Sequence, residues 1–184
     1  MCNRKRNQPW LVVLVVSWFA IILVGLWWLL DARLTWFDGS GRLQTRIADE
    51  GFTEQLKAQL RKHTDELAGA VFHINQKDCR CNWRTQGHQA QVKRQVSANK
   101  GHNYQLDIDQ ISALQNYIPA TPAIIIFNQN EHLVYLGPYA DGAFCNTETS
   151  FVEQLIPLVN ARHSQKQSGW INLAAKGCYC PVAF

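Results

Sequence analysis

The chain has 184 residues, of which 47% are hydrophobic and 17% are charged, a composition that excludes wholesale disorder. The formal net charge is only +4, and the basic residues are scattered among acidic ones instead of forming a stripe, so we expect no nucleic-acid partner. The length leaves room for one domain of ordinary size plus additional segments.

The first predicted element is a membrane anchor over residues 10–30. These residues carry no charge and would span about 30 Å as a helix. The alternative is a cleaved signal peptide, whose apolar core would be shorter and would end in small residues. This run ends instead in Trp27, Trp28 and two leucines, which favours a retained single-pass anchor.

Flanking charge predicts how the anchor is oriented. Residues 4–6 are basic, whereas Asp31 and Arg33 roughly cancel after the span, so residues 1–9 should lie in the cytoplasm. The remainder of the chain is then expected in the periplasm of a bacterium, anchored to the inner membrane, where thiols can be oxidised. A eukaryotic lumen is the alternative compartment.

The segment after the anchor is interpreted as a linker, residues 31–48, with a turn-rich centre at 37–42. A helix is predicted next over residues 49–69, because its apolar residues fall on one helical face and Gly69 is expected to end it.

Short elements follow one another from residue 70. Strands are predicted at residues 70–75, 102–109, 121–128 and 132–139, and helices at 81–101, 109–118 and 146–163. Asn146 or Thr147 is expected to cap the last helix, and Pro157 should bend or split it.

The resulting order is β-α-β-α-β-β-α. A right-handed crossover makes the first two strands parallel, and the closing hairpin is antiparallel. The predicted fold class is therefore α/β, with a mixed central sheet covered by helices on both faces and preceded by one transmembrane helix.

Two Cys-x-Cys pairs carry the chemistry that the sequence suggests. Cys79 and Cys81 follow the first strand and precede a helix, whose free N–H groups and positive dipole end stabilise a thiolate, the attacking species in exchange. Cys81 is close enough to resolve a mixed disulfide at Cys79. Metal binding and an inert structural role are the alternatives for this pair.

The domain that contains the first pair resembles the thioredoxin-like superfamily. From Ala70 to about His163 the order of elements is similar, with the dithiol in the same slot, and "ATPAIIIFNQNEHLVYLGPY" is similar to the cis-proline strand of that superfamily. The resemblance implies a redox-active disulfide and a cis Thr121–Pro122 peptide against the dithiol, where the Thr121 backbone binds an incoming peptide or thiol. The chain departs from the usual pattern because only Arg80 separates the cysteines, which leaves open a reductase, oxidase or isomerase role.

The resemblance implies a thioredoxin-like domain over residues 49–163, with an extra N-terminal helix, followed by a cysteine-bearing tail over residues 164–184. The arrangement of anchor, domain and tail resembles a group of membrane-anchored bacterial thioredoxin-like proteins.

The tail pair, Cys178 and Cys180, has three interpretations. About 14 extended residues before Cys178 span about 45 Å, so the pair can reach Cys79 and exchange electrons with it. The cysteines, with or without Cys145, could instead hold a soft metal ion such as Cu(I) or Zn(II). The third interpretation is a local Cys178–Cys180 disulfide that stiffens the tail.

The function predicted from these features is a membrane-anchored extracytoplasmic thiol–disulfide oxidoreductase. Cys79 would be the nucleophile, Cys81 the resolving thiol, Thr121–Pro122 the substrate platform, and Cys178 and Cys180 a secondary redox or disulfide pair. Its expected partners are protein or small thiol and disulfide substrates and a membrane redox protein, and we expect no cofactor or resident metal. The alternatives are a thiolate-based copper or zinc carrier and a non-catalytic thioredoxin-like scaffold. His73 is expected to be an interior residue, and His88 has no familiar metal spacing.

Overall fold

The computed structural model describes residues 9–144, 147–162 and 169–183, and it separates into two units at Arg33 and Leu34. The first unit consists of helix α1, Pro9–Asp31. Its 23 residues give a length of about 35 Å. Within the described ranges, α1 is the one helix long and apolar enough to cross a membrane, which agrees with a single-pass anchor.

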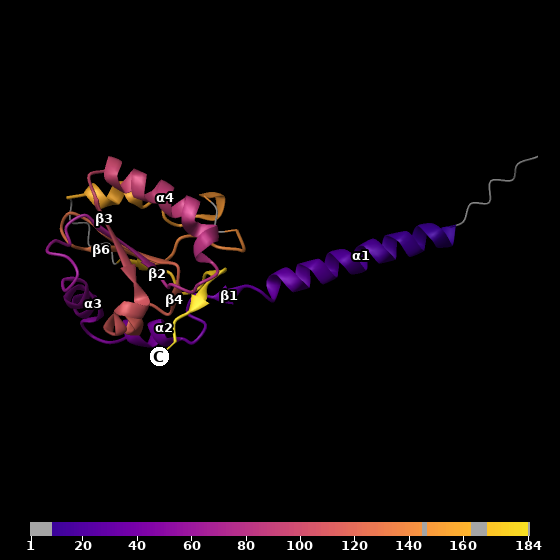
Figure 1. Cartoon of the computed structure of the whole chain (residues 1–184), viewed down its shortest axis with the longest axis horizontal. Helices are drawn as coiled ribbons and strands as arrows, with labels where there is room; N and C mark the ends of the chain where they lie inside the picture. The colour runs from indigo at the N-terminus through magenta and orange to yellow at the C-terminus, as the bar shows by residue number, and fades with distance from the viewer. Residues whose placement is uncertain (1–8, 145–146, 163–168, 184) are drawn as a thin grey trace, which may run out of the picture. The chain divides into compact units, whose positions relative to one another are not determined.

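The second unit is built on a five-stranded mixed sheet (Figure 1) with the strand order β3-β2-β5-β6-β7. The strands are β2 Ala70–Asn75, β3 His102–Asp107, β5 Ala123–Phe127, β6 Leu133–Pro138 and β7 Trp170–Ile171. Strands β2 and β3 are parallel, and β5 and β6 form an antiparallel hairpin, both as predicted. The edge strand β7, which runs parallel to β6, was not predicted.

Helices cover both faces of this sheet (Figure 1), as predicted. Alternate residues of β2 point to opposite sides: Val71 packs with Val92 and Val96 of α4, Asn82–Ala98, whereas Phe72 belongs to the larger core on the other face. That second core also holds residues of α2, Arg42–Ile47, and α3, Phe52–Leu60. Residues 81–101 were predicted to be helical, and α4 confirms this.

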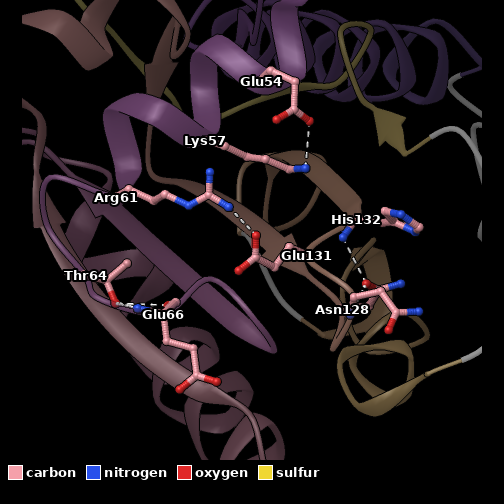
Figure 2. A network of polar contacts seen from close by, with 9 residues as sticks. Glu54, Lys57, Arg61, Thr64, Glu66, Asn128, Glu131 and His132 are labelled. Atoms are coloured by element: carbon pink, nitrogen blue, oxygen red, sulfur yellow. Dashed lines mark hydrogen bonds and ion pairs between the residues drawn. The ribbon is translucent and has the colours of Figure 1, made fainter.

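A polar network joins the end of α3 to the turn between β5 and β6, as Figure 2 shows. Arg61, just after α3, pairs with Glu131, a turn residue with a φ of 57°. Lys57, largely buried, pairs with Glu54 at 2.8 Å. The Asn128 side chain accepts two backbone N–H groups of the same turn, at 2.9 and 3.0 Å. Partly exposed ion pairs contribute at most about 1 kcal/mol, so this network mainly fixes the shape of the turn.

Three helix predictions differ from the structure. The helix expected over residues 49–69 is confined to α3, because the chain turns directly after Leu60. The helix expected over residues 109–118 is replaced by two 3₁₀ turns, η1 Ile108–Gln110 and η2 Ser112–Asn116. The Asp107 side chain accepts the N–H of Asp109 and so starts a new, tighter turn.

The last predicted helix, residues 146–163, is also wrong. The described part of this segment contains only the 3₁₀ turns η3 Thr147–Thr149 and η4 Ile156–Asn160. Pro157 lies at the start of η4, where its missing N–H is tolerated, but it cannot continue a helix from the preceding turn. The expected cap at Asn146 lies outside the described residues.

Most of the predicted linker, residues 31–48, belongs to the folded unit. Strand β1, Thr35–Trp36, pairs with β8, Lys176–Gly177, and the side chains of Phe37 and Leu43 are buried in the larger core. Burial of these two apolar side chains and pairing with the tail hold the segment in place.

Candidate functional site

The first cysteine pair lies where β2 passes into α4. Cys79 donates its backbone N–H to Gln76 and accepts the N–H of Asn82, which forms a tight turn directly before the helix. Asn82 also donates its side-chain amide to the Gln76 carbonyl at 2.6 Å. Cys81 is the N-cap residue of α4, and both cysteines are nearly buried, at 7% and 6% exposure.

The start of α4 provides an environment that favours negative charge on sulfur. The first N–H groups of a helix have no partner within it, and its dipole places a partial positive charge there. No side chain caps these N–H groups at Cys81. A thiolate formed at Cys79 or Cys81 would therefore be stabilised where it forms.

The C-terminal tail supplies a partner for each of these cysteines. Cys79 is bonded to Cys180 and Cys81 to Cys178, with Cα–Cα distances of 5.7 and 5.6 Å. The sequence predicted that the tail could reach Cys79, and the structure brings the two pairs together. The alternative of a local Cys178–Cys180 disulfide is wrong, because each tail cysteine is bonded across to the domain. Cys145 lies outside the described residues.

Backbone pairing holds the tail in this position. Strand β8 pairs with β1, and β9, Cys180–Pro181, pairs antiparallel with β4, Ala120–Thr121. The backbone N–H of Cys178 donates to Gly142, and that of Val182 donates to Pro119. These hydrogen bonds place the tail as an added strand beside the site.

Side chains of the tail are anchored as well. Tyr179 is buried, its hydroxyl donates to the Ala140 carbonyl at 2.6 Å, and its ring lies edge-on to Phe37. Val182 is also buried, and its carbonyl accepts a hydrogen bond from Arg42 at 2.9 Å. The tail is thus an integrated part of the domain and does not depend on the disulfides alone.

The Thr121–Pro122 peptide bond is cis, which confirms the prediction. Thr121 stands opposite Cys180 in the β4–β9 pair, and its carbonyl oxygen lies 3.7 Å from the Cys79 sulfur. The backbone edge that the sequence predicted for an incoming substrate is therefore occupied by the chain's own tail.

A neutral network, which the sequence did not reveal, lies behind Cys81. The Thr85 hydroxyl donates to the Cys81 carbonyl at 3.3 Å, and Gln89 donates to Thr85 and exchanges two hydrogen bonds with Asn75 at the end of β2. Residues 81, 85 and 89 are four apart and therefore share one helical face, and this spacing is the sequence signal that could have indicated the network. This network ties the first turns of α4 to the sheet and fixes the position of the cysteine turn.

The buried histidines are structural residues of the α4 face. His73 is fully buried, with its two ring nitrogens bonded to the Tyr139 hydroxyl at 2.5 Å and to Asn103 at 2.8 Å, as expected for an interior residue. Burial lowers the pKa of His73 to about 4, so it is neutral at physiological pH. His88 is bonded to Glu153 at 2.6 Å.

A family model described as "Domain of unknown function (DUF6436)" matches residues 49–182, so the chain belongs to this family. The match includes both cysteine pairs and the cis-proline segment. No curated protein and no solved structure is significantly similar to the chain.

Proposed function

We propose that this member of the family is a membrane-anchored, extracytoplasmic thiol–disulfide oxidoreductase with a thioredoxin-like fold. The observation that carries the proposal is the meeting of four cysteines at one point. Two lie at the start of α4, two lie on the paired tail, and the cis Thr121–Pro122 peptide lies beside them. Purely structural disulfides would need neither the helix terminus nor the cis-proline edge beside them.

The fold assignment rests on topology. The parallel β2–β3 pair joined by α4, followed by an antiparallel β5–β6 hairpin that starts after a cis-proline, agrees with the order that the resemblance implies. The terminal helix expected from that resemblance is replaced by η4 and the tail strand β7.

The location rests on charge and cysteine chemistry. Basic residues 4–6 precede α1, which favours a cytoplasmic N-terminus and a domain on the outer side of a bacterial inner membrane. Two disulfides in the domain are consistent with an oxidising compartment such as the periplasm.

The exposure of the four cysteines suggests the route of exchange. Cys180 is more exposed than Cys79, so a substrate thiolate attacks the Cys180 sulfur, forms a mixed disulfide with it, and expels Cys79 as a thiolate. The α4 terminus stabilises that leaving group and so accelerates the step. A second thiol of the substrate then attacks the substrate sulfur of the mixed disulfide and releases Cys180.

In this sequence the substrate dithiol becomes a disulfide, and the Cys79–Cys180 bridge becomes two thiols, so two electrons and two protons pass to the protein. In the opposite direction the Cys79 thiolate attacks a substrate disulfide, and Cys180, or Cys81 once its own bridge is reduced, resolves the mixed disulfide. Physiological substrates are then proteins or small molecules that carry thiols or disulfides, and a membrane redox protein would restore the starting state.

A non-catalytic scaffold is the second candidate, and the burial of Cys79 and Cys81 together with the firm anchoring of the tail favours it. In that case both bridges are structural, and their sulfurs do not exchange with external thiols at a useful rate.

One assay separates the two candidates. The purified full chain, in detergent, is incubated with a reduced peptide containing two cysteines and with glutathione disulfide, and peptide oxidation is followed by mass spectrometry. An oxidoreductase accelerates the reaction, Cys79→Ser abolishes the acceleration, and a matched Cys2→Ser/Cys145→Ser variant retains it. No acceleration by the wild-type chain, or full acceleration by Cys79→Ser, would refute the proposal.

A further inference from the structure

We infer that the four cysteines of the two bridges, once reduced, form one binding site for a soft thiophilic cation such as Zn(II) or Cu(I). The disulfide-bonded and metal-bound forms would then be two alternative states of the same residues. This inference does not depend on exchange with a substrate.

Sulfur positions carry the inference. The sulfur atoms of Cys79, Cys81 and Cys180 all lie within 4.8 Å of one another, and Cys178 is bonded to Cys81. A tetrahedral zinc site with Zn–S bonds of about 2.3 Å needs sulfurs about 3.8 Å apart. The bonded sulfurs must therefore separate, and the unbonded sulfurs among Cys79, Cys81 and Cys180 must approach by at most about 1 Å. The Cys178 sulfur lies outside that 4.8 Å group and must move further, by rotation of its side chain after the bond to Cys81 is reduced.

Reduction does not remove the reasons for the tail to stay in place. The β1–β8 and β4–β9 pairs, the buried Tyr179 and Val182 side chains and the Arg42 hydrogen bond to the tail carbonyl contain no sulfur. The two thiols of the tail consequently remain beside the two thiols at the start of α4. Because the four thiols are already close together, they lose less conformational entropy on binding a metal ion than separated cysteines would.

Charge at the site also favours such a complex. Four thiolates around a divalent ion carry a net charge of −2, and the positive end of the α4 dipole lies at Cys79 and Cys81. The low exposure of these two residues keeps competing water away from their sulfurs.

The metal-bound form is reached from the disulfide-bonded form in two steps, reduction and then binding of the ion. Two equivalents of a phosphine reductant convert the two disulfides to four thiols and become two phosphine oxides with oxygen taken from water. Binding of Zn(II) by all four sulfurs then releases four protons, so binding weakens as the pH falls.

The first experiment counts protected thiols in the wild-type full chain. The phosphine-reduced protein is alkylated with and without Zn(II), and the modified cysteines are counted by mass spectrometry. Without metal, all six cysteines of the chain should react, whereas with one equivalent of Zn(II) only Cys2 and Cys145 should react. Alkylation of all six in the presence of Zn(II), or protection of Cys145, would overturn the inference.

The second experiment uses Co(II) as a spectroscopic probe of thiolate ligation. The reduced chain should develop sulfur-to-cobalt charge-transfer absorption that saturates at one ion per chain, and the disulfide-bonded chain should not. Cys180→Ser should lower the Co(II) affinity by more than about 100-fold, beyond what loss of an outer-shell contact causes. Cys2→Ser/Cys145→Ser is the control that should leave the affinity unchanged. An unchanged affinity in Cys180→Ser would contradict the four-cysteine site.

Discussion

The two bridges close nested loops, and their contributions to stability should therefore depend on each other. The Cys79–Cys180 and Cys81–Cys178 bridges span sequence separations of 101 and 97 residues. Whichever bridge forms first closes a loop of this size and should stabilise the fold by about 4.7 kcal/mol through the entropy of the unfolded chain. The other then closes only the six-residue ring 79–81 plus 178–180, which is worth about 2.2 kcal/mol.

A double-mutant cycle of the two bridges should therefore be strongly non-additive. Replacing either bonded pair by alanines should lower the free energy of unfolding by about 2.2 kcal/mol from loop entropy, whereas replacing both should lower it by about 6.9 kcal/mol. The coupling energy is the difference, about 2.5 kcal/mol. Each replacement also removes packing contacts of its own two cysteines. These independent losses of free energy cancel when the single-mutant effects are subtracted from the double-mutant effect.

The assay is urea unfolding of the full chain in detergent, followed by tryptophan fluorescence. All variants carry Cys2→Ser and Cys145→Ser so that no other thiol can reshuffle the bridges. A coupling energy near zero would refute the nested-loop reasoning. It would mean that each bridge stabilises the domain through its own local contacts.

Three further changes test particular contacts. Burial lowers the pKa of His73 to about 4, whereas in the unfolded chain this histidine keeps its usual pKa of about 6.5. Between these two pH values only the unfolded chain is protonated at His73, so the free energy of unfolding should fall by about 3 kcal/mol as the pH falls from 6.5 to 4. A His73→Gln variant with the same pH profile of urea unfolding would contradict this. Tyr179→Phe leaves the buried Ala140 carbonyl without its donor and should lower the free energy of unfolding by about 1–2 kcal/mol; no change would show that the bond contributes nothing. Gly101→Ala places a Cβ 2.6 Å from Val159 Cγ1 and should cost about 1–3 kcal/mol, measured as a lower urea midpoint; an unchanged midpoint would show that the neighbours adjust freely.

Local patterns made part of the fold predictable. The apolar run at residues 70–75 predicted β2 with its observed bounds, and the run at residues 121–128 predicted the central strand β5, which is shorter, Ala123–Phe127. The Thr121–Pro122 pair at the start of that run allowed the cis bond to be predicted, because the dithiol upstream made the resemblance specific. In each case the signal lies within a few consecutive residues.

The remaining features depend on contacts that local patterns do not encode. Strands β4, β8 and β9 contain two residues each, too few for a periodic signal, and they exist because the tail folds back on the domain. Four cysteines allow three pairings, and composition alone cannot select the nested one. The C-terminal helix was wrongly predicted because its apolar spacing is also satisfied by a 3₁₀ turn that buries Ile156 and Val159 against α4.

The nested bridges also bear on the proposed exchange reaction. Opening one bridge opens only the six-residue ring formed by residues 79–81 and 178–180. The other bridge, the β4–β9 pair and Tyr179 keep the tail in register. The Cys180 sulfur of the mixed disulfide therefore stays close to the Cys79 thiolate. Reclosure, in which Cys79 attacks Cys180 and expels the substrate thiolate, is then an intramolecular step at high effective concentration. The second thiol of the substrate must attack the mixed disulfide before this reclosure occurs. The reaction therefore favours substrates whose second thiol attacks quickly. Dithiol substrates should accordingly be oxidised much faster than monothiols, and equal rates for a dicysteine peptide and its single-cysteine counterpart would argue against exchange at a docked tail.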